Sequence, residues 1–391
     1  MRCPKCLLCL SALLTLLGLK VYIEWTSESR LSKAYPGARS TLAGPTSAST
    51  EPTLPTNLSA RLGQTYPPPG TYWNRKQWQL GELPSEDCQA WGAATAAEIL
   101  DLDSYPEDLH RFLLSAACRN FPRWLPTGKA SPVAGCSASD VPYLLLAVKS
   151  EPGRFAERQA VRETWGSMAP GVRRLFLLGS PLGAGGPDLG SLVAWESWRY
   201  GDLLLWDFLD APYNRTLKDL QLFAWLGQHC PDVSFVLQAQ DDAFVHIPAL
   251  LQHLQSLPPA WARSLYLGEV FTKAKPLRHA GRPFYVPESF FEGSYPAYAS
   301  GGGYVIAGRL APWLLQAAGR VMPFPFDDVY TGLCFRALGL VPRAHPGFRT
   351  AWPAGRSVNP CTLRGLLLVQ PLSPQTSIRL WRQLRDPRLQ C

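Results

Sequence analysis

Apolar positions beyond about residue 140 follow two alternating periods. Short apolar runs that predict strands occupy residues 143–148, 174–178, 203–206 and 233–237. Between these runs, residues 154–165, 189–200 and 217–229 carry apolar side chains at helical spacing. Strands that alternate with helices of this length predict βαβ units and a mainly parallel sheet, so the expected fold class is α/β. Ligands of such sheets bind outside the carboxyl ends of the strands, where we expect the chemistry.

The N-terminus has a different pattern. Residues 7–23 are mostly apolar and carry one charge, Lys20, which lies near the end of the run where its amine can reach the membrane interface. Arg2 and Lys5 precede the run without an acid. These features predict a cytosolic tail (1–6), a transmembrane signal-anchor (7–23) and a lumenal remainder. A cleaved signal peptide is the alternative, but residues 20–25 offer no cleavage site with small side chains.

Residues 24–84 are predicted to form a lumenal stem. Pro, Ser, Thr, Gly and Ala dominate residues 36–70, which carry too little apolar surface to fold. A plain disordered linker is the alternative, and it gives the same architecture. The catalytic domain is expected over residues 85–391. Asn57 and Asn214 begin N-glycosylation sequons, and this topology places both in the lumen.

Composition agrees with a globular protein and narrows its ligands. Apolar residues make up 46% of the 391 positions and charged residues 17%. The excess of 38 basic over 30 acidic side chains, a net charge of +8, suits anionic ligands such as nucleotide diphosphates. Because this charge is spread along the chain without a block, we expect no nucleic-acid partner.

The cysteines indicate an oxidising compartment. Cys3, Cys6 and Cys9 lie beside or within the apolar N-terminal run, which leaves seven for the lumenal part. An odd number leaves one thiol free or bonded to another chain, and Cys391 at the terminus is the candidate.

Two adjacent acids, Asp241 and Asp242, follow the predicted strand 233–237. Carboxylates at the end of a buried strand are unfavourable unless something neutralises or solvates them. A divalent cation that bridges to a diphosphate would do so, because Mg²⁺ and Mn²⁺ take oxygen ligands from one or two carboxylates plus phosphates. An acidic turn that faces water is the alternative.

Three further patterns have both a functional and a structural interpretation. Arg158 and Arg162 lie four apart on one helical face, where they meet an anionic donor or are merely solvated. The glycines at 301–303 precede an apolar strand; glycine permits positive φ and close approach to a sugar or phosphate, and a tight turn is the alternative. Asp327 and Asp328 open a predicted helix over 329–338, where one acid can act as an N-cap.

Several blocks together resemble the β-1,3-glycosyltransferases of family 31. Residues 155–166, FAERQAVRETWG, are similar to the family signature FxxRxxxRxTWG. Matching blocks follow in the family's order at residues 174–179, 196–218, 295–303 and 327–330. The resemblance is strongest to the UDP-GlcNAc:βGal β-1,3-N-acetylglucosaminyltransferase branch. It implies a GT-A fold, a Golgi location, UDP-GlcNAc as donor with Mn²⁺, and extension of galactose-terminated glycans on glycoproteins into poly-N-acetyllactosamine.

The resemblance also implies roles for particular residues. Asp242 matches the family's last acid and would be the metal ligand, Asp328 would be the general base, and Asp327 a cap or acceptor contact. The implied donor-binding residues are Arg158, Arg162, Asp207, Lys218, Asp241, Gly302 and Gly303. Cys334 and Cys361, both in the late motif region, are an expected bridge.

Two positions depart from the family pattern. Gln240 stands where the family usually has a further acid, and Gln370 follows a late apolar strand where the family often has histidine. Because an amide is a weaker ligand than imidazole, we expect Mn²⁺ to be weakly bound.

Three functions fit these patterns. The leading one is inverting transfer of N-acetylglucosamine to the 3-hydroxyl of a terminal β-galactose. A regulatory protein that binds and activates a related glycosyltransferase, as a homo- or hetero-oligomer, is the second. The third keeps the fold and changes the donor to UDP-galactose.

Overall fold

The computed structural model describes residues 70–79, 97–115, 140–167, 169–181, 189–353 and 358–391, with single residues at 92, 94, 95, 133, 135 and 136. The predicted signal-anchor at 7–23 and Asn57 lie outside these residues. Within them, no helix has the length and apolar character needed to cross a membrane. The chain divides into two compact units, and every element below belongs to the larger one, residues 49–350 and 358–391.

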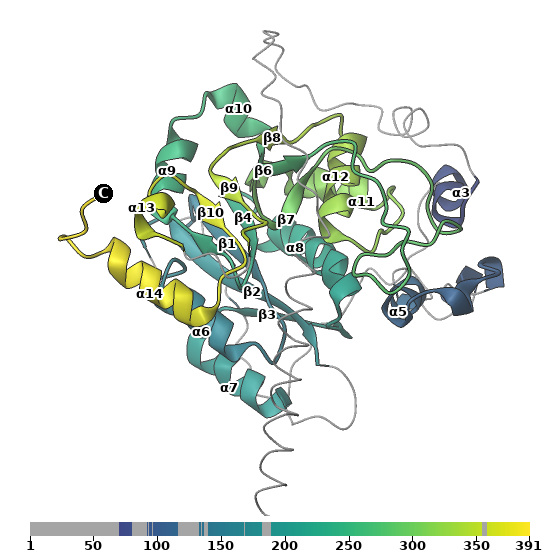
Figure 1. Ribbon diagram of the computed structural model, residues 1–391, viewed down its shortest axis with the longest axis horizontal. Helices are drawn as coiled ribbons and strands as arrows, with labels where there is room; N and C mark the ends of the chain where they lie inside the picture. The colour runs from purple at the N-terminus through teal and green to yellow at the C-terminus, as the bar shows by residue number, and fades with distance from the viewer. Residues whose placement is uncertain are drawn as a thin grey trace, which may run out of the picture. The chain divides into compact units, whose positions relative to one another are not determined.

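The elements of this unit alternate along the chain (Figure 1). The strands are β1 Leu144–Lys149, β2 Val172–Ser180, β3 Leu203–Leu209, β4 Phe235–Gln240, β5 Phe244–Val245, β6 Tyr266–Phe271, β7 Tyr298–Ala307, β8 Arg343–Ala344, β9 Phe348–Arg349 and β10 Leu368–Val369. The helices are α3 Tyr72–Gln79, η1 Leu102–Ser104, α5 Glu107–Ser115, α6 Phe155–Glu163, α7 Leu189–Tyr200, η2 Pro212–Asn214, α8 Arg215–His229, α9 Ile247–Gln255, α10 Pro259–Arg263, η3 Gly308–Leu310, α11 Ala311–Ala318, α12 Asp327–Ala337, α13 Pro360–Leu363 and α14 Pro374–Leu384.

Seven strands form the central sheet in the order β3-β2-β1-β4-β7-β6-β8. The strands β3, β2, β1 and β4 pair in parallel, as do β6 and β8. Strand β7 pairs antiparallel with both of its neighbours. The predicted α/β class with a mainly parallel sheet is therefore confirmed, and the four predicted strands are β1 to β4. A second sheet of three short strands has the order β5-β10-β9.

The strand order reverses beside β1. The chain moves from β1 through α6 to β2 and through α7 to β3, and then returns through α8 to β4 on the other side of β1. Because parallel crossovers are right-handed, α6 and α7 cover one face of the sheet, and α8 covers the other with α11 and α12 (Figure 1). All six residues of β1 are buried between these layers. Such a reversal opens a crevice at the carboxyl ends of the two adjacent strands, β1 and β4.

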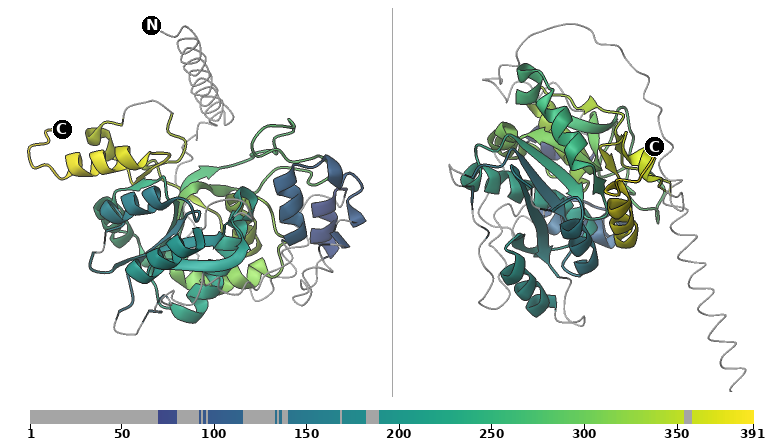
Figure 2. Two further views of the ribbon diagram at one scale, coloured as in Figure 1. Left: turned by 90° about the horizontal axis from the view of Figure 1, so that it is seen from below. Right: turned by 90° about the vertical axis from the view of Figure 1, so that its left-hand side faces the viewer.

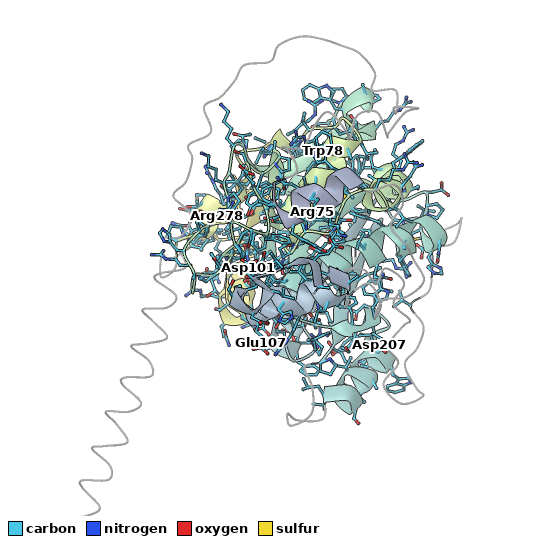
Figure 3. The ribbon with its side chains drawn as sticks, turned by 90° about the vertical axis from the view of Figure 1, so that its right-hand side faces the viewer. Arg75, Trp78, Asp101, Glu107, Asp207 and Arg278 are labelled. Carbon is cyan, nitrogen blue, oxygen red and sulfur yellow. A yellow bond between two sulfur atoms is a disulfide. The ribbon has the colours of Figure 1, made fainter. Side chains whose placement is uncertain are left out.

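The folded body begins before residue 85, so the predicted stem boundary is wrong. Helix α3 lies within the predicted stem, yet Trp73 is wholly buried. Its indole contacts the rings of Phe291 and Phe324, and Nε1 donates to the carbonyl oxygens of residues 322 and 323. Figure 2 shows α3 and α5 at the end of this unit opposite α14, and Figure 3 shows Arg75 and Trp78 on the outer surface of α3. The aromatic burial in α3 fixes this segment, whereas proline and serine content had predicted a stem.

The disulfides also differ from expectation. Cys361 bonds to Cys391, and Cys334 is a buried residue of α12 that is outside this disulfide. The expected Cys334–Cys361 bridge and the free Cys391 are therefore both wrong. Cys136 bonds to Cys230. Sequence order gave no information here, because the returning C-terminal tail brings residue 391 next to α13.

Candidate functional site

A polar pocket lies where the strand order reverses, at the carboxyl ends of β1 and β4. Its position follows from topology, because Ser150 continues β1 and Asp241 continues β4. Residues from the starts of α6 and α8 and from the end of β10 complete it. The lining residues are Lys149, Ser150, Glu151, Arg154, Arg215, Lys218, Gln240, Asp241, Asp242 and Gln370.

Asp241 is held within the pocket wall. It is buried, and it accepts a 2.6 Å hydrogen bond from Ser150 Oγ. The guanidinium of Arg154 donates to both carboxylate oxygens, with Nε at 3.0 and 2.9 Å and Nη2 2.8 Å from Oδ1. This bidentate pairing neutralises the carboxylate and orients Arg154 across the pocket.

Asp242 is the more available acid of the pair. It is half-buried, and its Oδ1 accepts a 3.0 Å hydrogen bond from Gln370 Nε2. Burial raises the pKa of Asp242 above its usual value, and the hydrogen bond from Gln370 opposes that rise. The structure therefore brings together the expected metal ligand and the glutamine that follows the late strand.

This donor set fits a divalent cation only in part. Among the residues that the structure describes, no three His, Cys, Asp or Glu side chains converge on one point. Asp242 supplies one carboxylate, Gln370 supplies an amide, and Arg154 occupies Asp241. Because Mg²⁺ and Mn²⁺ commonly bind through one or two carboxylates plus substrate phosphates, the set suits a cation that completes its shell with a diphosphate.

Two of the pocket's four cations are already paired inside the protein. Lys149 Nζ lies 2.7 Å from Asp219 Oδ1 and 2.5 Å from Asp327 Oδ2. Lys218 Nζ lies 2.7 Å from Asp210 Oδ1 and donates to the carbonyl oxygen of Ser150 at 2.6 Å.

Arg154 and Arg215 are more open than these lysines. The side chain of Arg154 is 35% exposed and that of Arg215 is 34% exposed, whereas each lysine is 2% exposed. Arg215 opens α8 and lies 3.6 Å from a carboxylate oxygen of Glu151, an ion pair that solvent screens. The two arginines are therefore the cations that an anion in this pocket can reach.

Arg158 and Arg162 do not face the pocket. Arg158 is wholly buried, with both nitrogens of its fork on Glu196 at 2.9 and 2.7 Å and its other donors on Ser150 and on backbone carbonyls. Arg162 binds Glu196 and Asp202, at 2.6 and 2.8 Å. Both arginines thus clamp α6 to α7 and to the start of β3. The expectation that they bind donor is wrong, because α7 covers this stretch of the helix face.

Asp207 also lies away from the pocket. It is an exposed residue of β3, and Figure 3 shows it at the edge of the face that carries α3 and α5. The strand was predicted to end at residue 206, but it continues to Leu209. The acid at the strand end is consequently Asp210, which pairs with Lys218 and accepts from the backbone N–H of Gly179 at 2.8 Å.

Gly302 and Gly303 lie inside β7 with no left-handed φ. A Cβ on Gly302 would come within 2.3 Å of Gln370 Oε1 and 2.7 Å of Thr350, and one on Gly303 within 2.2 Å of Leu368. Glycine is needed here because β10 and the segment after β9 pack against the strand. The two glycines therefore seat Gln370 beside Asp242, and the expected donor-sugar loop is a packed strand.

The acids at the start of α12 have opposite environments. Lys149 and Arg215 hold the pKa of Asp327 below its usual value, although burial opposes them. Burial and the neighbouring charge of Asp327 raise the pKa of Asp328 to about 7, against hydrogen bonds from the backbone N–H groups of Gly301 and Val329. Asp328 is half-buried, and it is a carboxylate poised to exchange a proton near neutral pH.

A short hydrogen-bonded path joins Asp328 to the pocket. Gln240 Nε2 donates to the carbonyl oxygen of Gly301 at 3.2 Å, and the N–H of Gly301 donates to Asp328 Oδ2 at 3.1 Å. One residue of β7, Gly301, therefore separates a pocket residue from the titratable acid. A pocket with two accessible arginines and an acid with a near-neutral pKa lie next to each other, an arrangement that suits group transfer.

Similarity to known proteins agrees with this arrangement. A family model described as galactosyltransferase matches residues 156–346. The human UDP-GlcNAc:betaGal beta-1,3-N-acetylglucosaminyltransferase 8 is 77% identical, and its mouse counterpart 76%, each over 100% of both chains. The mouse N-acetyllactosaminide beta-1,3-N-acetylglucosaminyltransferase 2 is 37% identical over 83% of this chain and 86% of that protein. The chain belongs to the β-1,3-N-acetylglucosaminyltransferase family.

Within this β-1,3-N-acetylglucosaminyltransferase, the sequence reasoning overlooked Arg154, Arg215 and Lys149. Arg154 lies four residues before Arg158, so the three arginines at 154, 158 and 162 form one stripe on α6. Of the three, Arg154, at the helix N-terminus, is the one that lines the pocket. The short sequence distance between Arg154 and the end of the preceding strand was the signal that could have distinguished it from the buried Arg158 and Arg162.

The sequon at Asn214 is enclosed by the fold. Asn214 is 3% exposed, and its Nδ2, the atom that would carry a glycan, donates to the carbonyl oxygen of Leu209 at 2.8 Å. This placement disfavours glycosylation at Asn214 in the folded β-1,3-N-acetylglucosaminyltransferase.

Proposed function

We propose that this chain transfers N-acetylglucosamine from UDP-GlcNAc to the 3-hydroxyl of a terminal β-galactose, with inversion at the anomeric carbon. Repeated transfer would extend poly-N-acetyllactosamine chains on glycoproteins. The names of the full-length relatives support this donor and linkage. The observation that carries the proposal is the position of Asp328, which one residue, Gly301, separates from the pocket and whose pKa burial and Asp327 raise to about 7.

Asp328 would act as the general base. Its carboxylate takes the proton of the acceptor 3-hydroxyl while that oxygen forms a bond to the anomeric carbon. The bond between this carbon and the β-phosphate oxygen breaks, and UDP leaves with its electron pair. Asp328 suits this role because a base with a pKa near 7 is about half ionised at neutral pH and still basic enough to accept a proton.

Arg154 and Arg215 would hold the diphosphate. Both side chains line the pocket, and both are about one third exposed, so their charges remain accessible to a ligand. A guanidinium binds phosphate oxygens in bidentate fashion, so the pair can counter the charge that grows on UDP as it departs. Lys149 and Lys218 support the pocket wall through their buried acids.

Asp242 and Gln370 would hold Mn²⁺ once the donor is bound. The cation would screen the diphosphate and thereby make UDP a better leaving group. Because the protein supplies only one free carboxylate, we expect measurable Mn²⁺ binding in the presence of UDP and much weaker binding without it.

A GT-A fold, a Golgi location and a single-pass type II topology complete the proposal. The mixed sheet, with an acid pair after β4 at the strand reversal, supports the fold. The two disulfides support an oxidising lumen, because such bonds persist there and are rare in the cytosol. The apolar run at 7–23 supports the anchor. Staining of an epitope at each terminus, with the plasma membrane alone permeabilised, tests this topology: only the N-terminal epitope should be accessible.

The activity is tested with purified residues 24–391, UDP-GlcNAc, a lactosamine-terminated acceptor and Mn²⁺. A β-1,3-linked product is the expected result, with UDP-galactose a much poorer donor. A clear preference for UDP-galactose would overturn the donor assignment. No product from folded protein that binds UDP would favour the regulatory function, and addition of a related transferase would then show stimulation.

A further inference from the structure

Lys149 is a buried lysine that joins three elements. It ends β1, and its Nζ contacts Asp219 of α8 and Asp327 of α12 at 2.7 and 2.5 Å. Thr331 Oγ1 donates to Asp219 Oδ2 at 3.3 Å, and the Lys149 amine lies 6.0 Å from the ring centre of Tyr304. A buried charge of this kind is retained only when its partners compensate the loss of hydration. The ion pairs therefore fix the first turn of α12 relative to the end of β1.

The cluster formed by Lys149, Asp219, Asp327 and Asp328, which includes the candidate base, contains more acids than cations. Lys149 supplies one cation inside the cluster, whereas Asp219, Asp327 and Asp328 supply up to three anions. The charged and titratable groups that face the acid pair are Lys149 from β1, Arg215 and Asp219 from α8, Tyr266 from β6 and Tyr304 from β7. Arg215 is partly exposed, so Lys149 is the buried cation in contact with Asp327.

We propose that Lys149 is a positioning residue for proton transfer: by holding Asp327 ionised at the start of α12, it leaves Asp328 free to take the acceptor's proton. This inference rests on the proposed function. The contact is direct only for Asp327, and Asp328 is the next residue, so Lys149 acts through Asp327. The lysine also lines the proposed donor pocket.

Removal of the cation has a predictable consequence. Without Lys149, the neighbouring acids Asp327 and Asp328 become two carboxylates without a buried counter-ion. Two such groups share a proton, as in carboxylate dyads, and the apparent pKa of the pair rises. Deprotonation of the base then needs a higher pH. The acid limb of the pH profile is the range in which kcat rises with pH as the base loses its proton. In Lys149→Met we therefore expect the midpoint of this acid limb to move to higher pH by about one unit or more.

A second substitution separates this role from donor binding. In Lys149→Met/Asp327→Asn, position 327 is neutral, and Asp328 no longer faces the adjacent like charge of Asp327, while Asp219 is unchanged from the single variant. The acid limb should therefore return to the pH of the original protein or below it. If Lys149 instead served only to bind the diphosphate, the second substitution would leave turnover and its pH dependence as in the single variant.

The experiment uses the full-length protein in detergent with UDP-GlcNAc and a lactosamine acceptor. The pH profile of kcat and the KM for donor are measured for the original protein, both variants above and Lys149→Arg, which keeps the charge. Lys218→Met is the matched control, since it removes the other buried pocket lysine and its pair with Asp210. Recovery of the acid limb in the double variant, with no shift in Lys218→Met, is the expected result. An unshifted limb in Lys149→Met would overturn the proposal.

A measurement that does not depend on turnover tests the role of Lys149 separately from the proposed transferase activity. The thermal midpoint is followed from pH 5.5 to pH 8.5 for the same variants. Uncompensated buried acids have raised pKa values in the folded state, so they lower stability as the pH rises. Lys149→Met should therefore lose more stability at pH 8.5 than at pH 5.5, and Asp327→Asn should reverse that difference. If the original protein has no transferase activity, this reversal still supports the ionic role of Lys149; its absence refutes that role.

Discussion

Replacing Asp328 by asparagine gives a sharp test of the candidate base. The amide is nearly isosteric with the carboxylate, so the fold should be kept. Its single oxygen can accept from the N–H group of Gly301 or from that of Val329 but not from both, because the carboxylate receives them on different oxygens, Oδ2 and Oδ1. It cannot take a proton at neutral pH. Loss of general-base catalysis costs about 10²- to 10⁴-fold in rate, and we expect kcat to fall within that range.

The pH dependence of the original protein follows from the same environment. The pKa of Asp328 is raised to about 7 by burial and by the charge of Asp327. With a base of this pKa, about one tenth of the molecules are active at pH 6 and about nine tenths at pH 8, so kcat/KM should rise about tenfold between the two. Asp328→Asn should have a flat profile over this interval.

Stability provides an independent readout on the same variant. Because the pKa of folded Asp328 lies above its unfolded value, ionisation costs stability as the pH rises from about 4 to about 7. Asp328→Asn removes that pH-dependent cost, so its thermal midpoint relative to that of the original protein should be higher at pH 8 than at pH 4. Asp207→Asn makes the same chemical change at an exposed position on β3 and should alter neither turnover nor stability. Unchanged turnover in Asp328→Asn would refute the base assignment.

Three further predictions concern the residues around the pocket. Arg158→Leu removes one of the two arginines that pair with buried Glu196 and should lower the free energy of unfolding by about 1.5–3 kcal/mol, as measured by chemical denaturation; a loss of UDP affinity with unchanged stability would contradict the structural role. Arg154→Met and Arg215→Met should each weaken UDP binding about tenfold or more in calorimetry, because each removes a charge that would meet phosphate. The thermal midpoint should change little in Arg215→Met and should fall in Arg154→Met, which leaves buried Asp241 without its guanidinium. Glycosidase treatment of Asn214→Gln and of the original protein should give the same mobility shift, since the buried amide carries no glycan.

The periodicity of the chain predicted the central sheet well. β1 to β4 are apolar runs buried on both faces, and such runs differ clearly from the amphipathic helices between them. The later part was harder, because β7 carries three glycines that the sequence presents as a turn. The absence of side chains at Gly302 and Gly303 lets Thr350, Leu368 and Gln370 pack against β7. Because these residues lie far from the glycines in the sequence, the contacts leave no local sequence pattern.

The sequence predicted where in the fold the candidate site lies better than it predicted which residues line it. Asp241, Asp242 and Asp328 lie where strand ends and the start of α12 place them. The predicted donor-binding role of Arg158 was wrong because helical spacing identifies residues on a shared face but not the element that covers this face. Here α7 covers it, and Glu196 of α7 pairs with Arg158. An error of three residues in the end of β3 likewise replaced Asp210 by Asp207.

The two halves of the site are held by different means, and this explains the contrast between its cations. Lys149 and Lys218 are paired with buried acids, so their charges fix β1, α8 and α12 relative to one another. Arg154 and Arg215 lie at helix starts with side chains that are 35% and 34% exposed, where they could exchange their partners for a phosphate. A leaving group that gains charge needs cations that can respond to it, whereas a base must keep its environment while the proton moves. In the proposed function, buried Lys149 beside the acid pair and the more accessible arginines around the donor would satisfy both requirements within one crevice.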